Sequence, residues 1–403
     1  MSDNYDFLII GGGIIGLSAA MQLKEKFPNK NILVIEKEKK LASHQTGHNS
    51  GVIHAGVYYQ PGSLKSKFCK LGVEQTVNFC TKHQLPFEQC GKLIVATTPQ
   101  EVERMKNLYE RCKKNGLKPK MLNKKELNTI EPNISGLGAI QVYETGIVDY
   151  IEMACTMAKE FNSMGGKIEL NSEVVSINES RDNLTTKLKN GKQIHSSFLI
   201  SCGGLQSDRI ARMMGINIDF QIVPFRGDYF KLKDSFNNIV KHLIYPIPDP
   251  AYPFLGVHLT KMIDGSVTVG PNAVLNLSRE GYNKSFFNFK DILEMIFFSG
   301  FWKLILKNWK PGLSEIYSSL NKNKYLKLCQ KYCPSLKISD LEPYRSGIRA
   351  QAVSKAGVLI HDFLVEETNR SLHVCNAPSP AATSSLPIGK YIVELLDRKI
   401  RKV

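Results

Sequence analysis

The chain opens with DFLIIGGGIIGLSAAMQLKEKFPN over residues 6–29 and NILVIE over residues 31–36. Its first apolar letters stop at glycine, as a buried parallel strand does, and helical spacing then continues to Pro28. A second apolar run closes on Glu36. This order of strand, glycine turn, helix, strand and acid predicts a dinucleotide-binding unit of an open α/β sheet.

Each glycine of this turn has a physical role in such a unit. Gly11 permits the tight turn, Gly13 lets the backbone approach a pyrophosphate, and Gly16 lets the helix pack on the sheet. The helix N-terminus offers free N–H groups and a partial positive charge to the phosphates. Glu36 lies 20 residues beyond Gly16, where a carboxylate can hold ribose hydroxyls. At this point both FAD and NAD fit the pattern.

The next segment, SHQTGHNSGVIHAGVYY at residues 43–59, is too rich in small, polar and glycine residues to be core. We interpret it as a loop whose backbone lies against a ligand. The alternative is a solvated linker, but two tyrosines, three histidines and an apolar Val52-Ile53 pair are an unusual composition for one.

From this loop onward the chain resembles the L-2-hydroxyglutarate oxidases (dehydrogenases) of the D-amino-acid-oxidase-like FAD superfamily. The resemblance implies an FAD-dependent enzyme that oxidises L-2-hydroxyglutarate to 2-oxoglutarate, with membrane quinone or oxygen as the electron acceptor. The segments that carry it span nearly the whole chain: IIGGGIIGLSAA at 9–20, HQTGHNSGVIHAGVYY at 44–59, PFRGDYF at 224–230, HLIYPIPDPAYPFLGVHLT at 242–260, DGSVTVGPNA at 264–273, GIRAQAV at 347–353 and NAPSPAATSSLPIG at 376–389.

Further cofactor contacts are expected where a strand over residues 198–202 ends in Gly203 before a helix, since open α/β sheets bind ligands there. The small residues of 376–389 precede a C-terminal helix and can bring backbone N–H groups to the flavin pyrimidine oxygen, although Pro378 and Pro380 remove two donors. The full expected set is Gly11, Gly13, Ile15, Gly16, Glu36, Thr46, His48, Asn49, Ser50, Gly51, Val175, Gly203, Ser379, Ala381, Ala382 and Thr383.

Oxidising a 2-hydroxy acid removes a hydride from Cα and a proton from the hydroxyl, so the protein must supply a base. Histidine is the usual choice because its pKa is near working pH. Among nine histidines we rank His54, which follows the flavin-approaching loop, ahead of His258, on an expected strand of the substrate domain.

A substrate with two carboxylates calls for a cation at each end of its site. Arginine meets a carboxylate through two hydrogen bonds, and Arg226 and Arg349 are each flanked by glycine on expected strands. The alternative for each arginine is a surface salt bridge. Tyr245 and Tyr58 are weaker candidates for contacts with the hydroxyl or a carboxylate.

The order of elements predicts an α/β fold with an α+β second part. Residues 1–75, 146–220 and 340–403 form a Rossmann-like FAD-binding domain. Residues 76–145 and 221–339 form a discontinuous substrate domain on a mixed or antiparallel sheet. Local signals are a helix capped by Asp149, a strand over 167–177 and a hairpin at Asn190-Gly191, and the prolines of 246–253 predict a lid or a rigid connector.

The amino-acid composition excludes several classes of protein. The chain has 403 residues, 42% of them apolar and 22% charged, which excludes a disordered, collagen-like or coiled-coil protein. Nine scattered cysteines without a C-x-x-C pair predict no metal site and a reducing compartment. The polar, acidic N-terminus predicts no leader peptide, and therefore a location on the cytoplasmic side of the membrane.

Lys and Arg number 53 against 37 Asp and Glu, a net charge of +16, which favours an anionic partner. Residues 288–310 combine aromatics, both tryptophans and several lysines, but their apolar run is shorter than the roughly 20 residues that a membrane span needs. Two readings stay open: a helix at the surface of an anionic membrane, peripheral to the inner membrane, or a helix that packs inward.

Two other functions were weighed. One is an FAD-dependent oxidation of another 2-hydroxy acid or an amino acid. The other is a flavoprotein that binds RNA through its excess charge. The basic residues form neither a stripe with aromatics nor an arginine run, so we predict no nucleic-acid partner.

Overall fold

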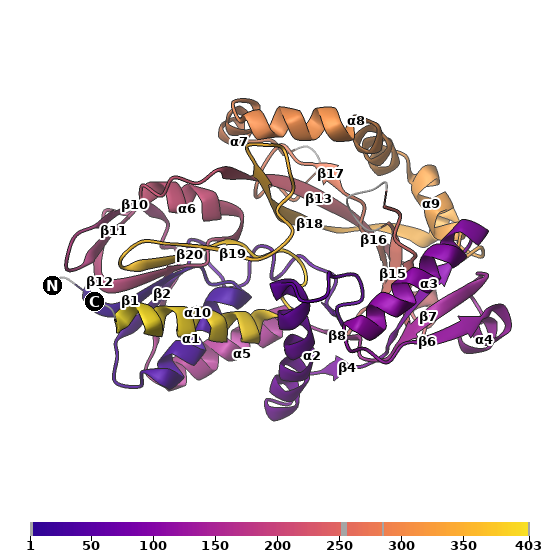
Figure 1. The fold of residues 1–403 in the computed structure, drawn as a ribbon, viewed down its shortest axis with the longest axis horizontal. Coiled ribbons are helices and arrows are strands. Elements are labelled where there is room, and N and C mark those ends of the chain that lie inside the picture. The colour runs from indigo at the N-terminus through magenta and orange to yellow at the C-terminus, as the bar shows by residue number, and fades with distance from the viewer. Residues whose placement is uncertain (1–2, 251–255, 284–285, 402–403) are drawn as a thin grey trace.

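The structure is a computed structural model that describes residues 3–250, 256–283 and 286–401 (Figure 1). Two large sheets lie side by side in Figure 1, with helices along their outer faces. The predicted α/β fold class, with a mixed second sheet, is confirmed.

The first sheet has eight strands in the order β10-β11-β12-β1-β2-β9, with β20 beside β12 and β19 beside β20. β1 pairs in parallel with both β2 and β12, as expected for a sheet covered on both faces. The strands are β1 (Asp3–Ile10), β2 (Ile32–Ile35), β9 (Lys167–Glu169), β10 (Val174–Glu179), β11 (Leu184–Leu188), β12 (Gln193–Ser201), β19 (Leu364–Glu367) and β20 (Ser371–Asn376).

Helices cover both faces of this sheet because its strand residues alternate between two apolar clusters. Ile9 packs with α1 (Ile14–Lys26), α5 (Tyr150–Ser163) and α10 (Ser385–Ile400) on one face. Leu8 packs toward α6 (Ser207–Met213) on the other.

The second sheet has nine strands in the order β17-β13-β16-β15-β14-β5-β7-β6, with β18 beside β13. They are β5 (Lys92–Ala96), β6 (Lys120–Asn123), β7 (Gly138–Val142), β13 (Phe220–Leu232), β14 (Leu243–Pro246), β15 (His258–Lys261), β16 (Val267–Gly270), β17 (Val274–Leu275) and β18 (Leu341–Ser354). The neighbouring helices are α3 (Pro99–Lys114), α4 (Lys124–Ile130), α7 (Phe289–Ile296), α8 (Ser299–Leu320) and α9 (Lys322–Gln330).

A third, small sheet has the strand order β3-β8-β4. Its strands occur where the chain passes from one large sheet to the other: β3 and β4 follow β2 of the first sheet, and β8 follows β7 of the second. The small sheet consists of β3 (Val52–Ile53), β8 (Gly146–Val148) and β4 (Phe87–Glu88), and α2 (Leu64–Lys82) follows the long loop after β3. Short 3-10 turns occupy Gly204–Gln206, Asp234–Phe236 and Ile338–Asp340.

Two of the three local structures predicted from the sequence are present in the fold. The Asn190-Gly191 hairpin joins antiparallel β11 and β12, and Asp149 accepts the N–H of Ile151 at the start of α5, so both are confirmed. The single strand predicted over 167–177 is wrong. Asn171 has φ +55° and breaks it into β9 and β10, which lie at opposite edges of the sheet.

The predicted division into two domains stays a prediction. Its boundary at residue 340 separates β18 from β13, the strand with which β18 pairs. β18 pairs with β13 from Phe220↔Ser354 to Leu232↔Leu341, within the second sheet. The predicted boundary at residue 340 groups β18 with the first sheet instead. β18 thus links the two sheets, because the chain returns from it to β19 and β20.

Candidate active site

One large cavity, of about 1490 Å³, takes its walls from both large sheets. At one end lie the carboxyl ends of β1 and β12, represented by Ile10 and Cys202. At the other end lie Tyr245, His258 and Arg349 of the second sheet. Small-molecule sites usually occupy about 300–1,000 Å³, so this cavity has room for a dinucleotide and a substrate together.

The first end of the cavity is built from backbone. Gly11 has φ +109°, and a Cβ placed on it would lie 2.4 Å from the carbonyl oxygen of Cys202. A Cβ on Gly16 would lie 2.0 Å from the carbonyl oxygen of Gly11. Both positions therefore require glycine, and the turn leaves its backbone open to the cavity, which is the cradle a pyrophosphate needs.

Glu36 is fixed at the edge of this cradle. Its carboxylate accepts the N–H of Gly12 at 2.7 Å and the N–H of Glu38 at 2.9 Å, and the side chain lines the cavity. These two hydrogen bonds fix the orientation of the Glu36 carboxylate. Its remaining acceptor capacity suits ribose hydroxyls.

The loop after β2 is held by its own polar side chains. Thr46 Oγ1 accepts the N–H of Ile14 at 3.0 Å, at the first residue of α1. Asn49 donates to the carbonyl oxygens of Gln45 and Thr46 at 3.1 and 2.7 Å. The His48 ring stacks on Tyr282 at 3.8 Å between centroids. The loop is therefore ordered against the cavity rather than a solvated linker.

The segment before α10 supplies backbone donors. Ala382 and Thr383 line the cavity, and within the described ranges no acceptor is found for their N–H groups. Unpaired donors at the N-terminal side of a helix suit a partial negative charge such as that of a flavin pyrimidine oxygen. The glycine cradle and these donors together fit a flavin dinucleotide.

Most of the expected cofactor residues line this cavity, and two do not. Gly51 lies against the carbonyl oxygen of Val148. Val175 is exposed, while its neighbour Val174 lines the cavity; Val175 is the extra residue where the pairing of β10 with β11 shifts register. The lining residues from that set are Gly11, Gly13, Ile15, Gly16, Glu36, Thr46, His48, Asn49, Ser50, Gly203, Ser379, Ala381, Ala382 and Thr383.

The second end of the cavity is built from side chains, and His258 is its most constrained group. The His258 ring stacks on Tyr245 at 3.8 Å, and its Nδ1 lies 3.0 Å from the carbonyl oxygen of Gly256. A carbonyl oxygen only accepts, so Nδ1 carries the proton and Nε2 keeps a lone pair. Burial lowers the pKa of His258 to about 3, which keeps the imidazole neutral.

His54 lies at the same end, after β3. Its backbone N–H donates to Thr383 Oγ1 at 3.1 Å, and its side chain lines the cavity. Burial, and then the charge of Lys92, lower the pKa of His54 well below its usual value. His54 and His258 are therefore brought together as two neutral imidazoles. Both predicted tyrosines, Tyr58 and Tyr245, line the same region with buried hydroxyls.

The two predicted arginines lie in different places. Arg349 lines the cavity, whereas Arg226 is absent from its walls and binds Asp228 at 2.8 Å and Asn276 at 3.0 Å. Gly227, the strand neighbour of Arg226, lines the cavity, and neighbouring residues of a strand face opposite sides, so the Arg226 side chain lies on the other face of β13. The structure thus places Arg226 outside the cavity wall.

Two lysines in this region were not predicted. Lys65, at the start of α2, lines the cavity. Lys92 on β5 is buried behind it, with its Nζ 4.0 Å from the centre of the Tyr245 ring. A lysine that opens the apolar strand KLIVA is a usable sequence signal for Lys92. Lys65 carries no local signal, because its neighbours come from distant segments.

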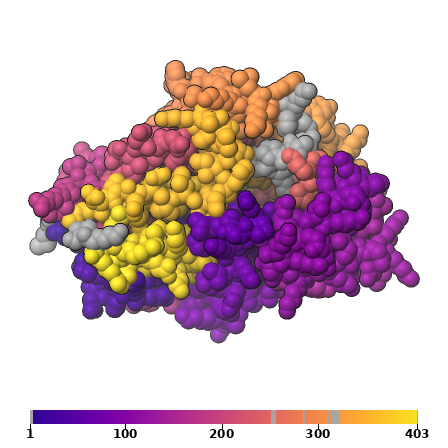
Figure 2. Space-filling model, viewed as in Figure 1, coloured from indigo at the N-terminus to yellow at the C-terminus, as the bar shows by residue number. Residues whose placement is uncertain are grey.

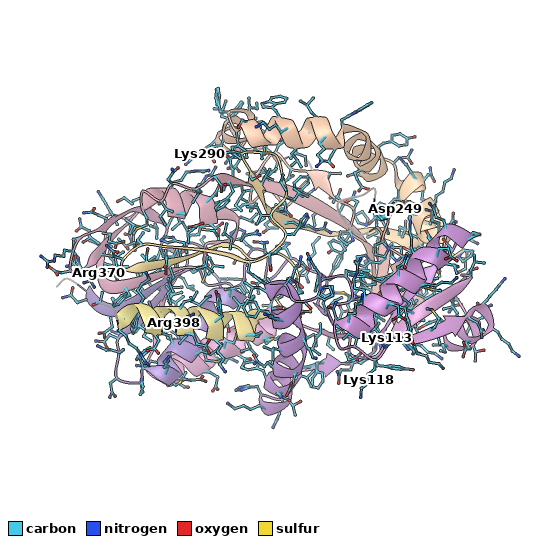
Figure 3. The ribbon with its side chains drawn as sticks, in the orientation of Figure 1. Lys113, Lys118, Asp249, Lys290, Arg370 and Arg398 are labelled. Atoms are coloured by element: carbon cyan, nitrogen blue, oxygen red, sulfur yellow. The ribbon has the colours of Figure 1, made fainter. Side chains whose placement is uncertain are left out.

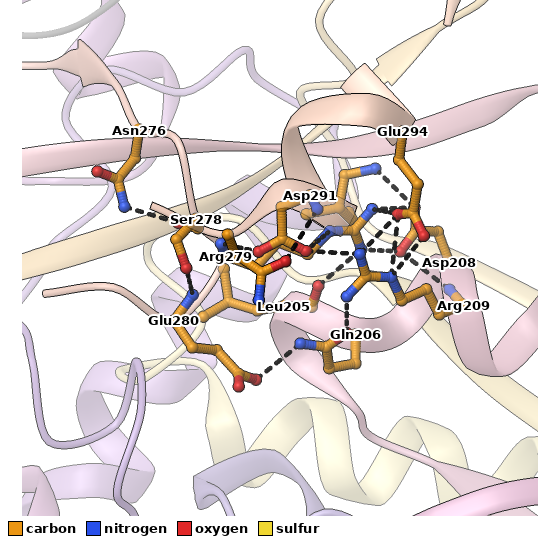
Figure 4. Close-up of polar contacts among 12 residues, drawn as sticks. Leu205, Gln206, Asp208, Arg209, Asn276, Ser278, Arg279, Glu280, Asp291 and Glu294 are labelled. Atoms are coloured by element: carbon orange, nitrogen blue, oxygen red, sulfur yellow. Dashed lines mark hydrogen bonds and ion pairs between the residues drawn. The ribbon is translucent and has the colours of Figure 1, made fainter. Parts of the chain in front are cut away.

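An ion-pair cluster joins the first sheet's α6 to the segment before α7, at the rim of the dinucleotide end (Figure 4). Arg279 pairs with Asp208 through both carboxylate oxygens, and Arg209 binds Asp291 at 2.5 Å and Glu294 at 2.7 Å. Burial is the largest single effect on Asp208 and opposes its ionisation, but the charge and hydrogen bonds of Arg279, with the N–H of Ile222 and the charge of Arg212, together lower the Asp208 pKa. The cluster holds this segment against the cavity rim.

A second polar group lies beside it. Glu38, His44 and Glu280 come close enough to hold a cation, but the Lys37 ammonium already binds Glu38 at 2.6 Å and Glu280 at 2.7 Å. That ammonium supplies the positive charge the two carboxylates need. The expectation of no metal stays a prediction.

Known proteins resemble the chain in sequence. The model of a family described as FAD dependent oxidoreductase (DAO) matches residues 6–395. L-2-hydroxyglutarate dehydrogenase of Escherichia coli (strain K12) is 54% identical over 389 residues, covering 96% of this chain and 92% of the relative. The mitochondrial L-2-hydroxyglutarate dehydrogenase of Homo sapiens is 41% identical, covering 99% and 90%.

Solved structures are similar in fold. L-alpha-glycerophosphate oxidase from Mycoplasma pneumoniae with FAD bound superposes with a TM-score of 0.80 at 22% identity, covering 98% of this chain and 95% of that one. Glycine oxidase from Geobacillus kaustophilus gives a TM-score of 0.76 at 16% identity, with the same coverage.

Proposed function

The chain belongs to the FAD-dependent oxidoreductase family, its cofactor is FAD, and we propose that it oxidises L-2-hydroxyglutarate to 2-oxoglutarate. The observation that carries the proposal is the neutral His258 in the cavity wall that Arg349 shares. Relatives named L-2-hydroxyglutarate dehydrogenase over nearly the whole chain support the choice of substrate.

The chemistry that FAD supplies when bound is acceptance of a hydride. The chain's own residues do the rest. Arg349 binds the carboxylate beside the reacting carbon, which fixes that carbon in the cavity. As the C2–H bond breaks, the hydroxyl proton passes to Nε2 of His258, and the C2–O bond becomes a carbonyl. The Gly256 carbonyl holds Nδ1–H and stabilises the imidazolium.

Anaerobic stopped-flow measurement of flavin absorbance with each enantiomer tests this proposal. We expect the L enantiomer to bleach the flavin and the D enantiomer to leave it oxidised. A flavin that stays yellow with L-2-hydroxyglutarate would contradict the substrate assignment. A panel of other 2-hydroxy acids and amino acids then identifies the alternative substrate.

We further propose that electrons pass to quinone at an anionic membrane surface, with oxygen as the alternative acceptor. Within the described ranges no helix is both long and apolar enough to cross a bilayer. However, the segment of α7 and α8 forms an outer surface of the molecule, orange in Figure 2. Its side chains include Phe289 (72% exposed), Phe297 (83%) and Leu306 (72%). Such apolar exposure is rare on a fully solvated helix.

Charged and aromatic groups beside these side chains support the membrane interpretation. Trp302 and Trp309 are half-exposed, and Lys303 and Lys307 lie on the same helix. Lys290 begins the neighbouring α7 (Figure 3). Aromatics with lysines at one surface suit a helix that lies in the interface of an anionic membrane.

Flotation with vesicles tests the membrane proposal. We expect binding to vesicles that contain anionic lipid, weaker binding to neutral vesicles, and loss of binding in the double variant Phe297→Ser with Leu306→Ser. A salt-sensitive shift of tRNA without vesicle binding would favour the nucleic-acid alternative. Reoxidation of reduced enzyme by a soluble quinone or by oxygen distinguishes the two acceptors.

A further inference from the structure

We propose that Lys65 binds the distal carboxylate of the substrate and makes the site selective for diacids. The diacid class itself rests on the proposed function. Arg226, the second cation expected from the sequence, binds Asp228 and does not line the cavity. The site therefore needs another cation if both carboxylates are to be held.

Lys65 is presented to the cavity by the start of α2. Ser63 caps this helix by accepting the N–H of Ser66 at 3.2 Å, and Asp362 accepts the N–H of Lys65 at 3.0 Å and that of Leu64 at 3.2 Å. Both carboxylate oxygens of Asp362 therefore accept hydrogen bonds from backbone N–H groups. The helix start is fixed, while the ammonium remains available.

The ammonium of Lys65 has an aromatic neighbour but no anion within bonding distance. Its Nζ lies 4.9 Å from the centre of the Tyr59 ring. Within residues 3–250, 256–283 and 286–401 it makes no hydrogen bond or ion pair. Burial lowers the Lys65 pKa to about 8, against the opposing charge of Asp362. A half-buried cation without a bonded partner is stabilised by an anionic ligand.

Two of the other cations that line the cavity are bound to carboxylates, and a third, Lys290, lies in α7 beside Asp291 of the ion-pair cluster. Arg209 and Lys37 are bound to carboxylates at the dinucleotide end. Lys92 is buried behind the Tyr245 ring and does not line the cavity. Lys65 and Arg349 are the cavity cations that act on the histidine end, since Lys65 lowers the pKa of His54 and Arg349 that of His258.

The two cations also come from different elements, α2 and β18. Arg349 presents a planar fork that can orient the carboxylate beside the reacting carbon. Lys65 presents a point charge on a flexible stem, which suffices for a carboxylate that only needs to be recognised. A diacid that spans them places its reacting carbon beside His54 and His258.

Binding of unreactive acids to the holoenzyme tests this without turnover. Glutarate and pentanoate have equal chain length and differ by one carboxylate, and their dissociation constants follow from perturbation of flavin absorbance. We expect wild type to prefer glutarate by about 10- to 100-fold, the usual range for a charge-assisted bond. Lys65→Met should lose that preference with pentanoate binding unchanged, and Lys65→Arg should largely retain it. The matched control is Lys67→Met, an exposed lysine of the same helix.

The pH dependence provides a second readout. Above pH 8 the free Lys65 loses its proton, so glutarate binding should weaken by up to about tenfold per pH unit. Lys92 also has a pKa of about 8. The variant Lys65→Arg shows which of the two lysines causes the weaker glutarate binding above pH 8. It should abolish this pH dependence if Lys65 is the cause and leave it unchanged if Lys92 is. The other groups that face Lys65 are Asp362, Cys69, Tyr59, His54 and His361.

Three results would overturn the inference: no glutarate preference in wild type, a preference that survives in Lys65→Met, or equal loss of both acids with a changed flavin spectrum. The last would mean that Lys65 contacts the flavin. Flavin reduction by L-2-hydroxyglutarate is measured separately. An enzyme that prefers glutarate through Lys65 but is not reduced by L-2-hydroxyglutarate would refute the proposed function alone.

Discussion

The two ends of the cavity are built on opposite principles. At the dinucleotide end the turn itself is made of backbone, with Gly11 and Gly16 against carbonyl oxygens, and side chains such as Glu36 and Thr46 hold that backbone in place. The histidine end is made of side chains from β14, β15, β18 and α2, placed by long-range packing. The first end should therefore fail when any atom is added, whereas the second should change gradually with the chemistry of each side chain.

The strongest way to break this contrast is Gly16→Ala. The new Cβ would lie 2.0 Å from the Gly11 carbonyl oxygen, so the turn must shift. We expect FAD binding to weaken by at least about 100-fold, equivalent to roughly 3 kcal/mol of strain. Absorbance of the purified protein near the flavin band measures retained cofactor. Gly312→Ala is the control, because a Cβ there meets nothing within 4 Å; a yellow Gly16→Ala protein would contradict the account.

At the side-chain end the largest expected effect belongs to His258→Asn. Loss of the base should lower the rate of flavin reduction by about 10²–10⁴-fold while FAD stays bound. Because the His258 pKa is about 3, wild type should show no acid limb from this group between pH 5 and 8, since the imidazole protonates only at lower pH. Stopped-flow reduction across pH measures both. A limb near pH 6.5 that His54→Asn removes would make His54 the base.

This contrast also explains what the sequence could predict. The β1-α1-β2 unit is set by local spacing, and the structure places Gly11, Gly13, Gly16 and Glu36 in the cavity wall. The structure places Arg226 outside the cavity, because the face that β13 turns to the cavity is set by long-range packing that the local sequence does not show. Lys65 was missed because α2 meets the cavity only through tertiary packing.

The two arginines of the β13–β18 pair sharpen the contrast. Arg349→Met should raise the KM for the diacid by about 10- to 100-fold, because Arg349 lines the cavity. Arg226→Met should leave KM unchanged but lower the free energy of unfolding by about 3–5 kcal/mol, because the buried Asp228 would lose the guanidinium that it binds. Steady-state kinetics and urea unfolding of both variants measure the difference. The reverse pattern would place Arg226 in the site.

The smallest expected effect concerns Glu36, a side chain that holds the backbone-built end in place. Glu36→Gln keeps the shape of Glu36 but replaces one of the oxygens that accept the N–H groups of Gly12 and Glu38. We expect FAD to bind about tenfold more weakly, in line with one lost charge-assisted hydrogen bond. Substrate preference and the pH profile of flavin reduction should not change, because Glu36 lies at the far end of the cavity from His258. Titration of apoprotein with FAD measures the first, and the glutarate and pentanoate pair measures the second. If Glu36→Gln altered acid selectivity, the two ends would be coupled, and the division between backbone-built and side-chain-built halves would have to be abandoned.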